Sequence, residues 1–259
     1  MKNQGYEDVI AAGRRLMKSN FTTSQMVTDQ QKKLDQPPVA KGCKTENGIL
    51  LPPFSEGDLA TNHYYTLLSQ RRSRRVFAQE EISLRALHFL LWSTQGVLQV
   101  AGGSRPYTLR PVASGGARHA FETYLVINRV QGLAPGLYHY LPLQNKLEFL
   151  GEPENRQDQL AASLSGQTWA GQSAAVLFWA ANAYRCEWRY GDKAHKLMLL
   201  DAGHVGQNLM LSAEALGLGS CCMAAYDQKA CDTLLGLDGE QEFVVYAAAV
   251  GTPKPQPEK

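Results

Sequence analysis

The chain has 259 residues, of which 44% are hydrophobic and 19% charged, as is usual for a soluble globular protein. Its 26 Lys and Arg face 24 Asp and Glu, a balance that argues against a nucleic-acid-binding domain, which usually carries a marked basic excess. No apolar run reaches the roughly 18 residues of a membrane span, and the first residues lack the apolar core of a secretory signal.

The cysteines and the N-terminal residues indicate the compartment and the domain organisation. Five cysteines, an odd number with two adjacent, favour the reducing cytoplasm, and no spacing among them is typical of a metal site. Residues 6–19 are predicted to form an amphipathic helix, and the proline-rich residues 20–57 an extended arm with little core of its own. We therefore expect residues 1–57 to be a helix and arm, and residues 58–259 to be the compact domain.

The compact domain is predicted to contain helices and paired strands in mixed order. Helices are expected at 59–73, at 82–97 with Ser83 as N-cap and Gly96 as its end, at 192–217, and at 227–237. Strands are expected at 122–128, 173–182, 220–226 and 242–251, with a hairpin at 132–150. This order favours an α+β fold, and the lack of G-x-G-x-x-G between a strand and a helix argues against a Rossmann site.

Four arginines bracket Ser73 in the segment "SQRRSRRVF": Arg71, Arg72, Arg74 and Arg75. Guanidinium groups bind phosphate through a planar fork of donors, so two or three together can hold a phosphate dianion. Because the net charge of the chain is small, this local cluster favours a small anionic ligand. A solvated helix end is the alternative.

Three other patterns allow both a functional and a structural interpretation. The loop at 113–119, "ASGGARH", has small residues that let backbone N–H groups approach a ligand, but it could also be a tight turn. Small residues at 221–225 could leave room for a planar group or simply pack closely. Asp201, His204 and Asn208 share one helical face, where a structural role is the simpler interpretation. Gly203 and Gly206, on the same helix, indicate that another helix packs closely against it, for example across a subunit interface.

Taken in order, five stretches resemble the nitroreductase family, and more narrowly its SagB-type branch, which includes azoline dehydrogenases of modified-peptide biosynthesis. They are "RRSRRVF", "RPVASGGARHAFETYLV", "GLAPGLYHY", "DAGHVGQNLMLSAEALGLGS" and "VVYAAAVG". The resemblance covers roughly residues 58–252. It implies a nitroreductase-like fold, with a central, mostly antiparallel mixed sheet flanked by helices. It also implies a homodimer with FMN at the subunit interface, reduced by NADH or NADPH.

The resemblance also assigns roles to residues. Arg71 and Arg72 would lie near the FMN phosphate, Ser73 would hydrogen-bond the flavin or its chain, and Arg75 would lie near the ribityl chain and pyrimidine edge. The partner subunit would contribute Ser114, Gly115 and Gly116. Backbone N–H groups near flavin N5 and O4 would come from Cys222, Met223, Ala224 and Ala225. No catalytic side chain or metal is implied, because flavin N5 carries the chemistry.

The chain departs from its relatives at two places. Ala120 stands where relatives often have proline, and Arg189 and Tyr190 form the dipeptide nearest to the Lys–Tyr pair of azoline-oxidising members. Arginine stays protonated and is a poor general base, which argues against azoline oxidation.

The resemblance therefore implies an FMN-dependent oxidoreductase, and the cysteine content favours the cytoplasm. The enzyme would transfer hydride from NAD(P)H through flavin N5 to a small-molecule acceptor, such as a nitroaromatic or a quinone. The alternative is a SagB-type dehydrogenase or a flavin-binding partner subunit in a peptide-modifying complex. A nucleic-acid binder is the hypothesis least consistent with the charge. Neither the substrate nor the preferred nicotinamide is specified by a motif.

Overall fold

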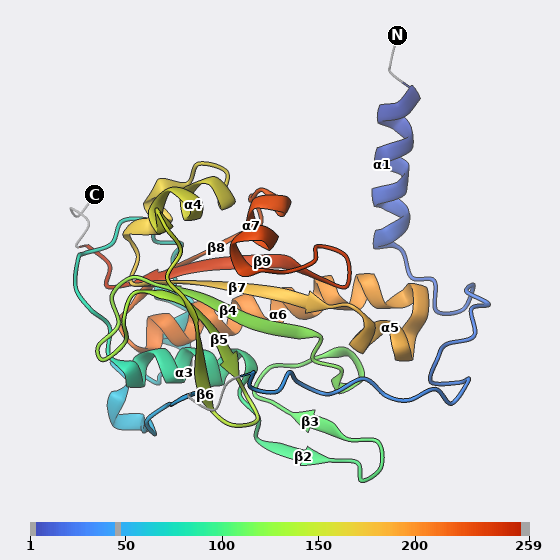
Figure 1. Ribbon diagram of the computed structural model, residues 1–259, viewed down its shortest axis with the longest axis horizontal. Helices are drawn as coiled ribbons and strands as arrows, with labels where there is room; N and C mark the ends of the chain where they lie inside the picture. Colours follow the sequence, from blue (N-terminus) through green and yellow to red (C-terminus); the bar gives the residue numbers. More distant parts are fainter. Residues whose placement is uncertain (1–3, 45–47, 255–259) are drawn as a thin grey trace.

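A seven-stranded sheet forms the centre of the computed structural model, which describes residues 4–44 and 48–254 (Figure 1). The strand order is β1-β6-β5-β4-β7-β9-β8, and every pairing is antiparallel. The strands are β1 (Ile49–Leu50), β4 (Phe121–Ile127), β5 (Gly136–Leu141), β6 (Lys146–Gly151), β7 (Ala175–Asn182), β8 (Gly219–Met223) and β9 (Glu242–Gly251). A separate ribbon pairs β2 (Gln99–Ala101) with β3 (Tyr107–Leu109). The expected α+β class is confirmed.

Helices cover both faces of the sheet (Figure 1). One face packs against α3 (Leu84–Gln95) and α6 (Ala194–Ala215), and the other against α4 (Arg156–Ser163) and α7 (Gln228–Leu235). The central strands β4 and β7 are apolar or buried at almost every position, because side chains of both faces enter a core. This packing fixes β8 and α6, which carry several of the candidate residues of the sequence analysis.

Several predicted element ends are confirmed and two are wrong. The Ser83 side chain accepts a hydrogen bond from the Ala86 amide at 3.1 Å, as an N-cap should, and α3 ends at Gly96. The helix expected at 59–73 is shorter: α2 (Tyr64–Gln70) ends before the arginines, so these lie in extended chain. Likewise β8 ends at Met223 rather than continuing to residue 226. Sequence analysis did not predict β2, β3, α4 or α5 (Tyr184–Tyr190).

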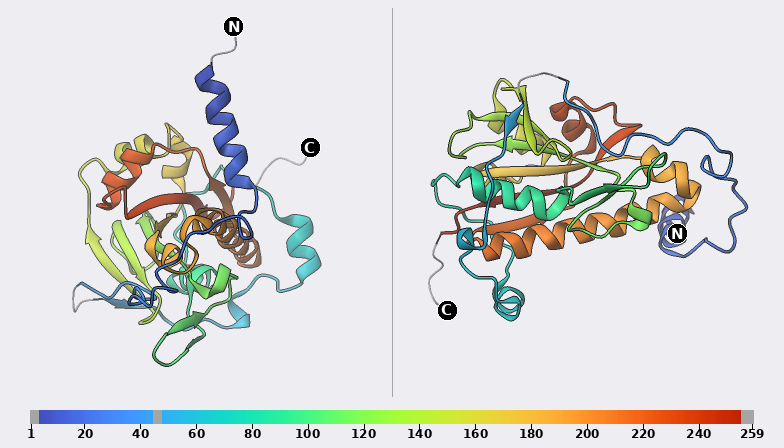
Figure 2. Two further views of the ribbon diagram at one scale, coloured as in Figure 1. Left: turned by 90° about the vertical axis from the view of Figure 1, so that its right-hand side faces the viewer. Right: turned by 90° about the horizontal axis from the view of Figure 1, so that it is seen from below.

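The N-terminal arm follows α1 (Gln4–Met17), which stands apart from the body in Figures 1 and 2. The arm then runs past α5 and returns to the sheet, where Ala40 and Leu51 are buried. Within the described residues, no helix is both long and apolar enough to span a bilayer.

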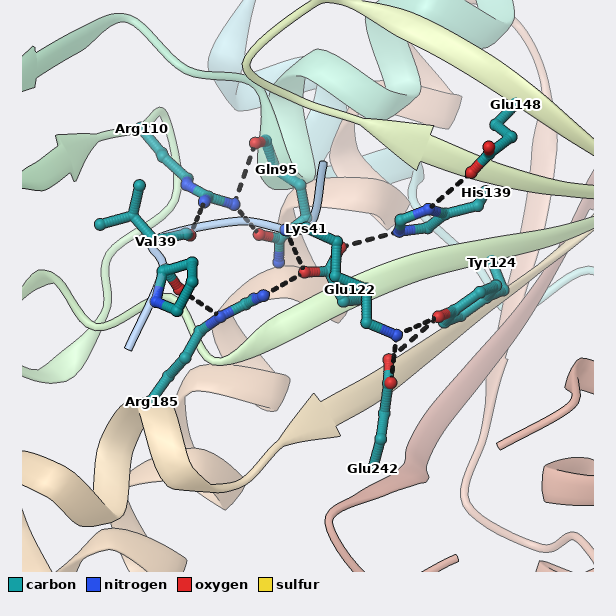
Figure 3. Close-up of polar contacts among 11 residues, drawn as sticks. Val39, Lys41, Gln95, Arg110, Glu122, Tyr124, His139, Glu148, Arg185 and Glu242 are labelled. Atoms are coloured by element: carbon teal, nitrogen blue, oxygen red, sulfur yellow. Dashed lines mark hydrogen bonds and ion pairs between the residues drawn. The ribbon is translucent and has the colours of Figure 1, made fainter. Parts of the chain in front are cut away.

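The arm is fastened to the sheet by a buried charge network (Figure 3). Glu122 on β4, 2% exposed, accepts hydrogen bonds from His139 Nε2 at 2.8 Å, from the Lys41 amide at 3.0 Å and from the Arg185 guanidinium. Burial of the carboxylate raises its pKa, but the hydrogen bonds and charges of His139 and Arg185 outweigh it and lower the pKa of Glu122 to about 2.

Further contacts join the same stretch of arm to the core. Lys41 Nζ forms an ion pair with Glu242 and donates to the Tyr124 hydroxyl at 2.8 Å. Arg110 and Arg185 donate to the carbonyls of residues 39 and 38, at 3.3 and 2.9 Å. Residues 38–41 therefore add backbone and side-chain partners to buried charged groups of the core, which such groups need.

Candidate functional site

The arginine segment lies beside the first residues of β8. Ser73 forms a parallel bridge with Ser220, and the Arg74 amide donates to the Ser220 carbonyl at 2.9 Å. The segment is extended because α2 stops at residue 70 and its next residues pair with a strand edge. Two of the three predicted groups, residues 71–75 and 222–225, are thus brought together.

Only one of the four arginines in this segment has an acidic partner among the described residues. Arg74 Nη2 lies 3.5 Å from Glu214 Oε1 on α6, so this guanidinium is held by the protein itself. Arg71, Arg72 and Arg75 have no carboxylate within 4.0 Å in the described part of the chain. Arg75 stacks over the Trp169 ring, at 5.8 Å from its centroid. Arg72 Nη1 donates to the carbonyls of Ser69 and Arg71, both at 2.8 Å, but none of the three guanidinium charges is neutralised by a carboxylate among the described residues. Such groups are suited to a phosphate dianion.

The two adjacent cysteines point to opposite sides of β8, as alternation along a strand requires. Cys221 is buried, whereas Cys222 is half-buried and lies 3.8 Å from the Gly206 carbonyl. Burial raises the pKa of both thiols, that of Cys222 to about 12, so both stay protonated at neutral pH. Met223 packs into the core, and Ala224 and Ala225 are exposed beyond the strand end.

The glycine-rich loop is held by α6. Ser114 Oγ donates to Asp201 at 2.6 Å, and the Gly115 amide donates to the same carboxylate at 3.1 Å. Burial raises the pKa of Asp201, opposed by these two hydrogen bonds. Gly116 has φ +58°, and a Cβ there would lie 2.3 Å from the Tyr190 hydroxyl, so the position requires glycine.

The glycine loop and the arginines lie at different places along α6. The loop contacts Asp201, whereas Arg71 Nη1 lies 3.9 Å from Met210 Sδ and Arg74 pairs with Glu214. Nine to thirteen residues of helix separate these contacts, roughly 14–20 Å along the axis. One chain does not join its own glycine loop to its arginine segment.

Asp201, His204 and Asn208, which share one face of α6, make mainly structural contacts. Asp201 anchors the glycine loop, and Asn208 Nδ2 donates to the Ser93 carbonyl at 2.8 Å. His204 is exposed, with Nδ1 4.0 Å from Asp201. No group of three or more His, Cys, Asp or Glu in the described ranges could hold a metal ion.

Sequence analysis missed two sets of residues near these segments. Near the C-terminus, Pro253 forms an antiparallel bridge with Phe77, and the Lys254 amide donates to the Val76 carbonyl at 3.1 Å. Lys254 therefore lies next to the arginine segment, while residues 255–259 fall outside the described residues. Arg189 and Tyr190, noted only as a departure from relatives, lie directly beside Gly116.

Comparison with known proteins identifies the class. The sequence pattern described as the nitroreductase family matches residues 68–252, and the chain belongs to this family. It is thereby placed among the oxidoreductases.

Particular relatives refine this placement. The chain is 31% identical to MJ1384 of Methanocaldococcus jannaschii, whose name assigns it to the nitroreductases, over 62% of this chain and 77% of that protein. It is 27% identical to the microcin B17-processing protein McbC of Escherichia coli, over 78% and 75%. The solved E. coli McbBCD microcin synthetase complex contains a chain of the same fold, with a TM-score of 0.60, 20% identity, and 95% and 91% coverage. The resemblance to the SagB-type branch is supported.

Proposed function

We propose that this protein is an FMN-dependent oxidoreductase that uses NADH or NADPH to reduce a small organic acceptor, such as a nitroaromatic or a quinone. The observation that carries the proposal is the set of three arginines without acidic partners beside β8. Membership of the nitroreductase family supports the reaction class.

The residues present fit FMN. Arg71 and Arg72 would bind its phosphate, Ser73 would hydrogen-bond the flavin or its chain, and Arg75 would stabilise negative charge at the ribityl and pyrimidine edge. The chain after β8, from Cys222 to Ala225, would present backbone N–H groups to the ring edge. FMN would supply the redox chemistry of hydride transfer, and the residues of this chain would bind it, orient it and set the charge around it.

We also propose a homodimer in which each site uses two chains. The separation of the Ser114–Gly116 loop from the arginines along α6 supports this arrangement, because the partner's loop could then complete the site. Exposed apolar side chains lie on α6 and on α2, which stands off the body in Figure 2: Leu199, Leu200, Tyr65 and Leu68.

A second candidate function is a flavin-binding subunit or dehydrogenase of a peptide-modifying complex. The similarity to McbC over 78% of this chain favours it. The Arg189 side chain, beside Gly116, argues against proton abstraction there, because a guanidinium does not act as a base near neutral pH.

A direct experiment separates these functions. The purified protein should be yellow, with flavin absorbance, and should oxidise NADH or NADPH when a nitroaromatic or quinone is added. Bound flavin without turnover would favour the second function. A colourless protein that retains no flavin after incubation with FMN and removal of the free FMN would contradict both.

The first variant concerns the phosphate contact. Arg71→Ala should weaken FMN binding about tenfold to a hundredfold, since a charge-assisted hydrogen bond contributes about 1.5–3 kcal/mol. Titration of apoprotein with FMN, followed by flavin fluorescence, measures the change. Arg74→Ala is the matched control, because Arg74 is engaged by Glu214. Equal FMN affinity of Arg71→Ala and wild type would remove Arg71 from the site.

The second variant concerns assembly. Light scattering should report about twice the 28.6 kDa chain mass for the wild type. Leu199→Asp with Leu200→Asp, both 52% exposed on α6, should shift this mass to the monomer and release FMN. The control is Leu143→Asp, an exposed leucine in the β5–β6 turn. A wild-type monomer that keeps its flavin would contradict the shared site.

A further inference from the structure

A pocket of about 490 Å³ lies between the N-terminal arm and the junction of α5 with α6. The arm forms one wall, with residues from 21 to 31, and Arg189, Tyr190 and Lys193 form the other. The arm is held in place on α5: the Gln30 amide donates to the Trp188 carbonyl at 2.8 Å. The pocket is therefore built by the fold.

The pocket is cationic and aromatic. Lys193 Nζ lies 5.9 Å from the centroid of the Phe21 ring, Arg189 Cζ lies 5.5 Å from that of Tyr190, and the two rings meet edge to face at 6.1 Å. No Asp or Glu lines it, and its remaining polar lining residues are neutral Ser, Thr and Gln side chains. Within the described ranges, neither cation has a carboxylate within 4.0 Å.

The nearby carboxylates are turned to other partners. Asp192 accepts hydrogen bonds from Asn20 and Ser24, at 2.9 and 2.8 Å. Glu187 pairs with His195 at 2.9 Å, and Asp29 pairs with Lys32. None of these carboxylates forms an ion pair with Arg189 or Lys193, so both cations stay available to an anionic ligand.

A third guanidinium adds to the positive charge close by. Arg118 is only 8% exposed, and its Nε donates to the Gly116 carbonyl at 3.2 Å. Burial, with the like charge of Arg189, lowers the pKa of Arg118. Arg118 and Arg189 therefore flank Gly116, whose Cβ would also meet the Tyr190 hydroxyl. These contacts join the pocket to the glycine loop.

We propose that this pocket binds the anionic group, a phosphate or a carboxylate, of an aromatic substrate. Cationic donors would hold the anion, and Phe21 and Tyr190 would contact the planar part. Its position beside a flavin rests on the proposed function, whereas anion binding does not. The anion has two possible sources, the ribose 2′-phosphate of NADPH or a carboxylate on the acceptor.

The test uses the double variant Arg189→Gln, Lys193→Gln in the protein as purified, with Lys229→Gln on α7 as control. Calorimetry should show that wild type binds adenosine 2′-monophosphate or 4-nitrobenzoate, and that the double variant binds it at least tenfold more weakly. Adenosine and 4-nitrobenzyl alcohol, which lack the anion, should show no such difference. This binding measurement requires no turnover, so it tests anion binding even if the proposed function is wrong.

Kinetics then identify the source. If NADPH supplies the anion, the ratio of kcat/KM for NADPH over NADH falls at least tenfold in the double variant. If the acceptor supplies it, the ratio for 4-nitrobenzoate over 4-nitrobenzyl alcohol falls instead. Flavin content should stay at the wild-type level. The proposal is overturned if wild type binds neither anion, or if its affinity for both is unchanged in the double variant.

Discussion

Replacing Glu122 with alanine should lower the free energy of unfolding by about 3–5 kcal/mol, the cost of removing one partner from a buried ion pair. The Arg185 guanidinium, the His139 ring and the Lys41 amide would all lose the Glu122 carboxylate as an acceptor in a buried site (Figure 3). Each kcal/mol shifts the melting temperature of a chain of this size by about 2–4 °C. Thermal and urea unfolding measure the effect.

Two comparisons make the Glu122 result specific. Glu122→Gln keeps the shape and some hydrogen bonds but removes the charge, so it should lie between wild type and Glu122→Ala. Glu80→Gln, at an exposed position, should change stability by less than about 0.5 kcal/mol. If Glu122→Ala unfolds like the control, the network does not hold the arm to the sheet.

Local signals in the sequence explain which elements could be predicted. Ser83 caps α3 through a hydrogen bond to a residue three positions on, and Gly217, with φ +70°, follows the end of α6. Both signals lie within the element that they end. The apolar runs of β4 and β7 similarly reflect burial on both faces.

Long-range contacts could not be read in the same way. Lys41 pairs with Glu242, which is 201 residues away, and neither has a local pattern that points to the other. The end of α2 at residue 70 also has no glycine or proline signal; the next residues leave the helix because Ser73 pairs with Ser220 on β8. The arginines were recognised by composition, but their place on the strand edge depends on that pairing.

The contacts of the glycine loop could least be predicted from the sequence. Its small residues suggested a ligand, and its anchor Asp201 was noted only for helical spacing. The hydrogen bonds from Ser114 and Gly115 to Asp201 connect residues 87 and 86 positions apart, which only the fold brings together. The fold also places the Tyr190 hydroxyl against Gly116, so Tyr190 lies next to the glycine loop.

The last residue of this loop, His119, should make the protein less stable as the pH falls below neutral. His119 is 4% exposed, and burial, with the charge of Arg110, lowers its pKa from 6.5 to about 3. A group with a lower pKa in the folded state binds more protons when unfolded, so protonation favours unfolding. Its contribution is complete above pH 6.5 and is lost as the pH falls from there towards about 3.

Urea unfolding of wild type and His119→Asn at pH 7, 6 and 5 tests this dependence. Asparagine tolerates the positive φ of +44° at this position and does not titrate. Between pH 7 and pH 5 the wild type should lose roughly 2 kcal/mol more than the variant. Glu122 titrates below this range, since its pKa falls from 4.5 to about 2, and buried His88, whose pKa is also lowered, is present in both proteins. Equal losses in the two proteins would mean that His119 takes up its proton in the folded state and that the loop opens to water.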